Sequence, residues 1–511
     1  MAAKKTVHFE TLGCRLNQIE TEGAAEFFHQ KNWTVQMKAA AAKDAEDASV
    51  ALCVLNTCAV TGKAEQKGRR TINLLLKKFP SAALIVTGCY AELSQSQIQK
   101  MDKRIAVLPG SAKSVLSKVP EFLESLKAQD CAGGELSQAQ DVAAEQLAAA
   151  LREFLSGSNK LVLKKIEPQA QKSGGLFLAP KASAIEPFAL LPKTFFAHSR
   201  SSVKIQDGCN NSCAFCAIHF ARGRSVSIPA ALALERIAAL EAAGQSEVVL
   251  TGVNIGQYRG EWQGGFLDIS GLLELILERT KSVAIRFSSV YPETVTDRFA
   301  AVIKNPRVRP HFHISVQSGS DSVLKRMNRA YSRQTVLDAC RRLKEAKQNP
   351  FLACDIITGF PDETDGDFAQ TLSLIEEAGF VNVHAFPYSP RPGTAAASFT
   401  PKIPERVKDQ RVAALNECSV KAKIAYINSF AGLVREAVAE SVHGNPYVPQ
   451  GKKLSRAVTD NFIHAEILLD KDAAAPMEGE RIFVRIKAAN EAAIRAGQEW
   501  EARAEIVMAA E

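Results

Sequence analysis

Short apolar runs alternate with longer helical patterns along most of this 511-residue chain, and this alternation constrains the fold more than any other feature. Three such runs lie in the first hundred residues, at 7–12, 50–55 and 82–86. Strands that alternate with helices pair in parallel, and their crossovers are right-handed. The region 4–122 is therefore predicted to be a parallel α/β domain whose loops meet at the carboxyl edge of its sheet.

The same alternation returns after residue 199 and continues for six units. The expected strands are 203–206, 247–251, 284–288, 311–316, 351–357 and 381–386. Six consecutive β/α units predict an incomplete (β/α)6 TIM-like barrel over 199–430. The active site of such a barrel lies at the carboxyl ends of its strands.

Two other regions have a different character. Ala, Gln, Ser, Lys and Gly dominate 123–198, which we interpret as an insert or linker that is partly disordered and contains one amphipathic helix at 142–155. Over 431–511 the chain is predicted to form a small antiparallel β-barrel. That prediction rests on alternating apolar and polar residues at 457–469, 481–486 and 500–507.

Composition narrows the class of protein. No run of eighteen apolar residues occurs, and no apolar signal core follows the N-terminal Met-Ala-Ala-Lys-Lys, so we expect a cytoplasmic protein without a membrane partner. Lys and Arg together exceed Asp and Glu by eight, which suits an RNA partner without requiring one. The eleven cysteines are sparse and odd in number, so clusters among them favour metal ligation or chemistry over disulfides.

The strongest chemical motif is a cysteine triad directly after the first expected barrel strand. Cys209, Cys213 and Cys216 form a C-x3-C-x2-C pattern. Three thiolates on a short loop can bind three irons of a 4Fe–4S cluster and leave the fourth iron open to the amino and carboxylate groups of a cofactor. The alternative is a structural zinc site, with His219 as a fourth ligand.

A second group of cysteines lies in the N-terminal domain. Cys14, Cys58 and Cys89 each fall within a few residues of the end of an expected strand, so the topology brings them to one edge of one sheet. Each alone would be a buried core residue more often than a ligand, but together they predict a second cluster. Cys53 lies inside an apolar strand, where packing in the core explains it better.

The motifs around these cysteines resemble a known family. The triad, with Phe215 before its last cysteine, resembles the radical S-adenosylmethionine superfamily, and the N-terminal motifs resemble the methylthiotransferases within it. The matching N-terminal segments are Thr11-Leu-Gly-Cys-Arg-Leu-Asn-Gln, Asn56-Thr-Cys and Thr87-Gly-Cys-Tyr. The matching barrel segments are Ser315-Val-Gln-Ser-Gly-Ser, Asp355-Ile-Ile-Thr-Gly-Phe-Pro and Phe386-Pro-Tyr-Ser-Pro-Arg-Pro-Gly-Thr. The region 431–511 lies where these enzymes carry a TRAM domain.

This resemblance implies a function and its cofactors. The opening motif and Pro387-Tyr-Ser-Pro-Arg-Pro look most like the branch that adds a methylthio group to C2 of N6-threonylcarbamoyladenosine at position 37 of tRNA. The implied cofactors are two 4Fe–4S clusters and S-adenosyl-L-methionine, and the implied partners are tRNA, an electron donor and a sulfur donor. No catalytic group is expected beyond the cluster-bound cofactors.

The remaining site residues are expected from their positions. Gly252, Gln317 and Gly359, at strand ends, are expected to contact the cofactor. Arg222 and Arg224, just past the triad, and Arg391, after the last barrel strand, are expected to contact substrate. Arg391 is the candidate partner for the carboxylate of the threonylcarbamoyl group. A basic group between Asp321 and Lys347 is expected either to bind phosphates or to form a solvated helix face; its densest members are Lys325, Arg326, Arg329 and Arg333.

Three alternatives to this function stay open. The substrate could be isopentenyladenosine in tRNA, or a side chain of a ribosomal protein. The chain could also be a non-catalytic RNA-binding protein stabilised by zinc on the barrel triad and His219.

Overall fold

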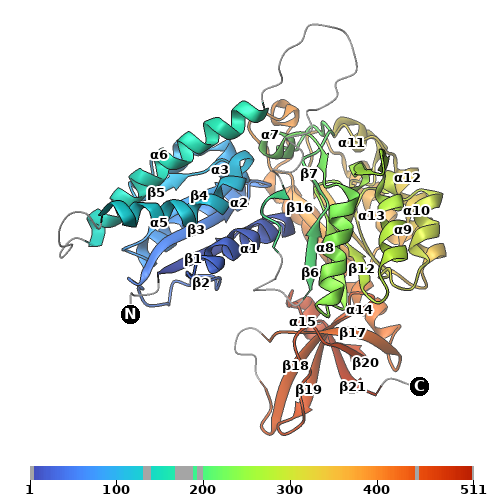
Figure 1. The fold of residues 1–511 in the computed structure, drawn as a ribbon. Coiled ribbons are helices and arrows are strands. Elements are labelled where there is room, and N and C mark those ends of the chain that lie inside the picture. Colours follow the sequence, from blue (N-terminus) through green and yellow to red (C-terminus); the bar gives the residue numbers. More distant parts are fainter. Residues whose placement is uncertain (1–4, 131–139, 167–187, 193–199, 443–447, 509–511) are drawn as a thin grey trace.

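The computed structural model describes residues 5–130, 140–166, 188–192, 200–442 and 448–508. Three regions follow one another along the chain: an α/β domain, a larger barrel of strands and helices, and a small β-barrel (Figure 1). Figure 1 places the α/β domain beside the larger barrel and the small β-barrel below it. Among the described residues, no helix is both long and apolar enough to cross a bilayer.

The N-terminal domain is built on a five-stranded sheet in the order β2-β1-β3-β4-β5, in which all neighbours are parallel. Its strands are β1 (Thr6–Thr11), β2 (Thr34–Gln36), β3 (Val50–Thr57), β4 (Ala83–Gly88) and β5 (Ile105–Val107). Its helices are α1 (Arg15–Gln30), α2 (Gly62–Lys78), α3 (Cys89–Leu93), α4 (Gln95–Gln99), η1 (Gly110–Lys118), α5 (Val119–Asp130) and α6 (Gln140–Ile166). The parallel α/β prediction is confirmed.

Alternating side chains of β3 explain how both faces of this sheet are covered. Leu52 and Val54 pack with residues of α1 and α6 on one face. Cys53 and Leu55 pack with residues of α2 on the other. Cys53 is therefore a core residue, as its place inside an apolar strand predicts.

Helix α6 shows that part of 123–198 belongs to the N-terminal domain. The helix predicted at 142–155 is present and longer than expected, since α6 spans Gln140–Ile166. Ala148, Leu151 and Leu155 are buried in the same core as α1. This stretch is thus an integral helix rather than a linker. The disorder expected elsewhere in the insert falls on 131–139, 167–187 and 193–199, which lie outside the described residues.

The described piece 188–192 passes between the two larger regions. Leu190 packs in the N-terminal core, whereas Phe188 and Leu191 pack in the core of the barrel. Its backbone runs so close to α1 that a Cβ at Gly23 would collide with the carbonyl of Leu190. Gly23 therefore permits the close approach of this segment.

The larger barrel has six main parallel strands and is not closed. They are β6 (Ser201–Lys204), β9 (Glu247–Thr251), β12 (Ala284–Phe287), β14 (His311–Gln317), β15 (Phe351–Thr358) and β16 (Asn382–Pro387). They form the sheets β12-β9-β6 and β13-β14-β15-β16, which adjoin at β12 and β14. The short strands are β7 (Gln206–Asp207), β8 (Val226–Ser227), β10 (Gly260–Trp262), β11 (Gly265–Leu267) and β13 (Ser289–Val290). The incomplete (β/α)6 barrel is confirmed.

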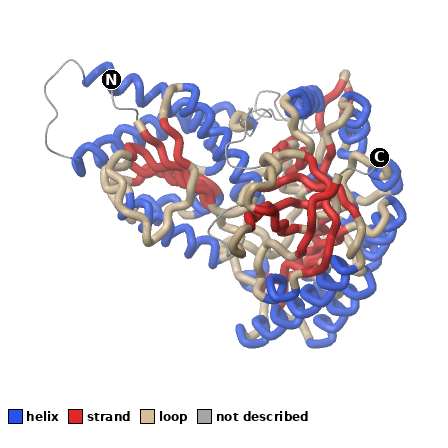
Figure 2. Tube along the Cα trace, turned by 90° about the horizontal axis from the view of Figure 1, so that it is seen from below, coloured by secondary structure: helices blue, strands red, loops and turns tan. Residues whose placement is uncertain are grey.

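Helices surround these strands on the outside (Figure 2). The longer ones are α8 (Ala230–Ala242), α9 (Ile269–Arg279), α10 (Asp297–Ile303), α12 (Arg333–Ala346), α13 (Asp365–Ala378) and α14 (Glu405–Asn428). The short ones are α7 (Ile218–Arg222), η3 (Ile255–Gln257), η4 (Pro292–Thr294), α11 (Asp321–Arg326) and η5 (Ala395–Ser398). Apolar residues of the strands and of α8–α13 share one core.

The C-terminal region is a closed barrel of five strands, in the order β17-β18-β19-β21-β20. The expected β-barrel is confirmed, but it is not wholly antiparallel, because β19 and β21 pair in parallel. Its elements are β17 (Val434–Glu440), β18 (Lys452–Thr459), β19 (His464–Asp470), β20 (Arg481–Ala489), α15 (Glu491–Arg495) and β21 (Ala502–Val507). It packs against the amino ends of the larger barrel's strands. There the ring of His311 stacks on Phe462 with centroids 3.9 Å apart, and Arg286 donates to the carbonyl of Thr459.

Candidate active site

The three N-terminal cysteines lie at the carboxyl ends of three adjacent strands. Cys14 caps the N-terminus of α1 after β1, Cys58 follows β3 directly, and Cys89 begins α3 after β4. The strand register brings these ends level, since Thr11 pairs with Asn56 and the next residue, Thr57, pairs with Gly88. The parallel sheet thus gathers residues that are far apart in sequence.

Packing at this edge is tight. Gly13 has a φ of 103°, in the left-handed region, and a Cβ there would come within 2.5 Å of the Cβ of Cys58. Burial is the main cause that raises the pKa of the Cys58 thiol to about 11, and the nearby thiols of Cys14 and Cys89 add to the rise. Thiols this close together on one edge fit a shared metal cluster, which holds its ligands as thiolates.

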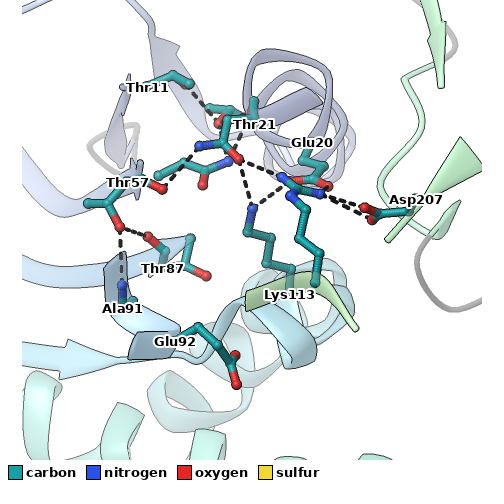
Figure 3. A network of polar contacts seen from close by, with 12 residues as sticks. Thr11, Glu20, Thr21, Thr57, Thr87, Ala91, Glu92, Lys113 and Asp207 are labelled. Carbon is teal, nitrogen blue, oxygen red and sulfur yellow. Dashed lines mark hydrogen bonds and ion pairs between the residues drawn. The ribbon is translucent and has the colours of Figure 1, made fainter. Parts of the chain in front are cut away.

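Hydrogen bonds hold the three loops against one another (Figure 3). The amide of Asn17 on α1 donates to the carbonyls of Leu12 and Thr57, both at 3.0 Å. The amide of Asn56 donates back to the carbonyl of Asn17 at 2.9 Å. The hydroxyl of Thr57 donates to the carbonyl of Thr87. These bonds fix the relative positions of the loops that carry the cysteines.

The barrel triad lies on the loop between β7 and α7. Backbone N–H groups of Asn211 and Ile218 donate to the sulfurs of Cys209 and Cys216, each at 3.4 Å. The guanidinium of Arg329 donates to the sulfur of Cys213 at 3.1 Å. Burial raises the pKa of the Cys216 thiol to about 11. Hydrogen-bond donors around three convergent thiols form the environment that sulfur ligands of an iron–sulfur cluster require.

The geometry of the triad bears on the zinc alternative in one respect. Among the described residues, the one compact group of three or more metal-ligating atoms lies elsewhere in the barrel and does not include the triad or His219. In a cubane each of three irons takes one thiolate, so a cluster does not require the thiols to surround a single ion.

Both cysteine sets border one cavity of about 320 Å³. Cys89 contributes from the N-terminal domain, and Cys209, Cys213 and Cys216 contribute from the barrel. Apolar and aromatic side chains line much of the rest, including Val60, Phe215, Tyr291, Ile357, Phe386 and Tyr388. One N-terminal cysteine and all three cysteines of the barrel triad therefore adjoin the same cavity.

Family models match the two regions that carry the cysteines. Residues 203–375 match the radical SAM superfamily, and residues 6–110 match a family described as uncharacterized protein family UPF0004. A threonylcarbamoyladenosine tRNA methylthiotransferase MtaB from Treponema pallidum is 40% identical over 96% of this chain and 99% of its own length. The chain belongs to the radical SAM methylthiotransferase family.

Other relatives agree with this membership. The MtaB protein of Bacillus subtilis is 31% identical over 90% of this chain and 89% of its own. A tRNA-2-methylthio-N(6)-dimethylallyladenosine synthase from Treponema denticola is 30% identical over 90% of this chain and 97% of its own. Among solved structures, the radical S-adenosylmethionine methyltransferase TsrM from Kitasatospora setae matches with a TM-score of 0.47 and 12% identity over 77% of each chain.

As a member of the radical SAM methylthiotransferase family, the chain is an enzyme that uses S-adenosylmethionine and a 4Fe–4S cluster. The donors on the barrel loop fit that cluster: three thiols, two backbone N–H groups and one guanidinium converge there. Membership of this family favours a cluster over the structural-zinc alternative.

The three expected cofactor contacts lie in different surroundings. Gln317 lines the cavity and has a φ of 70°, which is unusual for a residue other than glycine. Gly252 packs against Gln206, and its neighbour Val253 lines the cavity instead. Gly359 packs against the side chain of Lys408, away from the cavity lining. The expected cofactor contact at Gly359 is therefore not supported by its position.

Arg222 joins the two domains instead of facing a substrate. Its side chain is 7% exposed and pairs with Glu20 of α1 at 2.9 Å and with Asp207 of the barrel at 3.0 Å. It also donates to the amide oxygen of Asn17 at 2.7 Å. The expectation that Arg222 contacts substrate is corrected, because two carboxylates and an amide already use its donors.

The surroundings of Arg222 form a buried ionic network (Figure 3). Glu20 also pairs with Lys113 and Lys204. Burial alone would raise the pKa of Glu20, but Arg222, Lys113 and Lys204 outweigh it and hold that pKa well below its usual range. Burial alone would lower the pKa of Arg222. The opposite effect is larger, and the pKa is raised well above its usual value, first by Asp207 and Glu20 and then by the thiols of Cys89 and Cys14. This cation therefore stays charged close to the N-terminal cysteines.

Arg391 likewise bridges domains. It is 4% exposed, and its guanidinium pairs with Glu65 on α2. It is not among the residues that line the cavity. The position of Arg391 therefore gives no support to the expected contact with a substrate carboxylate, because its guanidinium pairs with an internal carboxylate. Arg224 is exposed beside the triad loop and remains a candidate for substrate contact.

The expected phosphate-binding group is mostly engaged within the protein. Arg326 donates to the carbonyl of Asp362, and Arg333 pairs with Glu377 at 2.7 Å. Arg329 donates to the sulfur of Cys213, and its guanidinium carbon lies 4.8 Å from the ring centroids of both Tyr291 and Tyr331. These internal partners give no support to a phosphate-binding group, and the sequence did not show that Arg329, between α11 and α12, reaches the sulfur of Cys213.

Proposed function

We propose that this enzyme adds a methylthio group to C2 of N6-threonylcarbamoyladenosine at position 37 of tRNA. The observation that carries the proposal is the single cavity bordered by both cysteine sets. A chemistry that both activates a carbon and delivers sulfur to it needs both sources within reach of one substrate. The MtaB relatives, among them one 40% identical over 96% of this chain, are named for this nucleoside.

We further propose that Cys14, Cys58 and Cys89 hold a second 4Fe–4S cluster. Their common edge, tight packing and proximity to the buried Arg222 support it. When both groups and S-adenosylmethionine are bound, they supply a carbon radical and the methylated sulfur that joins it. The chain's own part is to hold these groups at fixed separation through the hydrogen bonds and ion pairs between its domains.

The walls of the cavity suit a flipped-out purine. Phe386 at the end of β16 is 43% exposed, and Val60 on the loop after Cys58 is 55% exposed. An aromatic face in such a place can stack a base, as in single-stranded RNA recognition. The apolar lining excludes water from reactive groups. The C-terminal β-barrel is the proposed RNA-binding region. The enzyme is proposed to be cytoplasmic and to use an electron donor and a sulfur donor.

The alternative substrate with direct support is isopentenyladenosine. The Treponema denticola relative, at 30% identity, is named for the dimethylallyl form of the nucleoside. The identity to the threonylcarbamoyladenosine relative is higher, 40%, over 96% of the chain.

The deciding experiment is a substrate comparison with anaerobically reconstituted enzyme. Three tRNAs of one sequence carry adenosine, isopentenyladenosine or threonylcarbamoyladenosine beside the anticodon, and nucleoside mass spectrometry follows the product. We expect methylthio product on the threonylcarbamoyl form alone. A preference for the isopentenyl form contradicts the proposed substrate. No product on any tRNA, with cofactor cleavage intact, points to a protein substrate.

A further inference from the structure

Three polar side chains from three adjacent barrel strands meet near the cavity. His313 lies on β14, Asp355 on β15 and His384 on β16. One ligand atom from each lies within 4.8 Å of the others. Asp355 and His384 are register partners in the parallel sheet, which fixes them side by side.

All three side chains leave the sheet on the side opposite its packed core. The following or preceding residues on the same strands, Ile314, Cys354 and Val383, lie in the core shared with the outer helices. Because successive residues of a strand point to opposite faces, His313, Asp355 and His384 face the interior of the barrel. Asp355 itself lines the cavity beside the cysteine triad.

Ordinary hydrogen bonding does not explain the arrangement. Nε2 of His313 lies 2.9 Å from Oδ1 of Asp355, yet this buried nitrogen has no hydrogen-bond partner of acceptable geometry in the described part of the chain. Nδ1 of His384 lies 3.9 Å from the same carboxylate oxygen. Two imidazole nitrogens thus converge on one carboxylate oxygen without a directed bond, as ligands around a shared ion do.

We propose that His313, Asp355 and His384 bind a divalent first-row transition-metal ion. Two imidazoles and one carboxylate form the donor set that suits zinc or ferrous iron and leaves further coordination positions open. The three ligands carry one negative charge, which a divalent cation outweighs. The compact spacing suits a single ion.

The open positions of such an ion would face the cavity that Asp355 lines. Oxygen ligands are natural occupants of those positions, and the threonylcarbamoyl group offers a carboxylate. The ion therefore takes the cationic role that Arg391 does not fill. This assignment of the oxygen ligand, unlike the metal site itself, rests on the function proposed above.

Zinc binding to the cluster-loaded enzyme tests the site. Holoenzyme is equilibrated anaerobically with buffered zinc, desalted and analysed for zinc, iron and sulfide. We expect one zinc ion per chain beside an unchanged iron content. The double substitution His313→Asn and His384→Asn is expected to abolish zinc uptake while iron and sulfide stay the same. His29→Gln, on the exposed end of α1, is the matched control and is expected to bind zinc as the wild-type enzyme does.

The ligand set gives a second, independent measurement. X-ray absorption at the zinc edge is expected to show nitrogen and oxygen neighbours and no sulfur. Any one of three results would overturn the metal site. They are sulfur neighbours around the zinc, equal zinc uptake by the double variant, and no zinc on wild-type enzyme that has both clusters intact. These outcomes are separate from the substrate comparison, which reads product on tRNA.

The proposed contact between the metal ion and the substrate carboxylate is tested by a separate measurement. Threonylcarbamoyladenosine nucleoside is expected to tighten zinc binding, whereas adenosine is expected to leave it unchanged. Equal zinc affinity with both nucleosides would overturn the carboxylate contact and leave the metal site standing.

Discussion

The guanidinium of Arg329 donates a hydrogen bond to the sulfur of Cys213 across 3.1 Å while it lies over the rings of Tyr291 and Tyr331. Burial alone would lower the pKa of Arg329, but the two tyrosines and Cys213 raise it, so the side chain remains a cation. A fixed positive charge beside a ligand sulfur favours the reduced, more negative state of a cluster.

Arg329→Gln is therefore expected to lower the reduction potential of the barrel cluster. Turnover is expected to fall by about 10- to 100-fold, the usual effect of losing a group that orients a metal ligand. A redox titration followed by electron paramagnetic resonance measures the potential. Arg326→Gln, which removes a guanidinium bonded to the carbonyl of Asp362, is the matched control. An unchanged potential in Arg329→Gln would contradict the role of this arginine.

Arg222→Gln is expected to weaken the interface between the N-terminal domain and the barrel. The change removes one of two buried cations that Glu20 and Asp207 share, and Lys204 still pairs with both carboxylates. Loss of one partner from a buried ion pair costs roughly 3–5 kcal/mol. Urea unfolding under anaerobic conditions measures the free energy. Arg298→Gln removes an exposed cation and is expected to cost about 0–1 kcal/mol, so equal losses would argue against a structural role for Arg222.

The two cysteine sets are expected to separate in function. The triple alanine variant at Cys14, Cys58 and Cys89 is expected to keep roughly half of about eight irons. It is expected to cleave S-adenosylmethionine but to yield no methylthio product. The corresponding variant at Cys209, Cys213 and Cys216 is expected to lose cleavage as well. Iron analysis and chromatography of cleaved cofactor measure both. Loss of cleavage in the first variant, with the barrel cluster intact, would contradict separate roles.

Helix α6 is expected to contribute to stability rather than to act as a spacer. Leu151 is fully buried against the N-terminal sheet, so Leu151→Ala is expected to cost about 2–5 kcal/mol of unfolding free energy. Glu153→Ala, on the exposed face of the same helix, is expected to change it by less than about 0.5 kcal/mol. Thermal or urea unfolding compares the two. A negligible loss in Leu151→Ala would return this segment to the role of a linker.

Local sequence patterns were sufficient for the positions of the cysteines. Cys14, Cys58 and Cys89 follow apolar runs, and parallel strands bring their carboxyl ends to one edge wherever such runs alternate with helices. The position of the barrel triad follows from its sequence motif alone, because its three thiols share one loop. The amphipathic period at 142–155 likewise predicted a helix, although composition suggested a linker around it.

The roles of the arginines needed the tertiary structure. Arg222 and Glu20 are 202 residues apart, and Arg391 and Glu65 are 326 apart, so their pairing depends on how two domains dock. A sequence shows that an arginine follows a functional motif, but it does not show which carboxylate reaches the guanidinium first. Arg329 gives the converse case, since a residue expected on a solvated helix face donates to a cluster sulfur.

The sequence by itself determined the order of strands and helices and the six cysteines at strand ends, because short-range periodicity and chain order decide these features. The tertiary structure alone decided the cavity bordered by Cys89 and the barrel triad, the partners of Arg222 and Arg391, and the meeting of His313, Asp355 and His384. Those features depend on strand register and domain docking, which join groups through space at distances that no local pattern encodes.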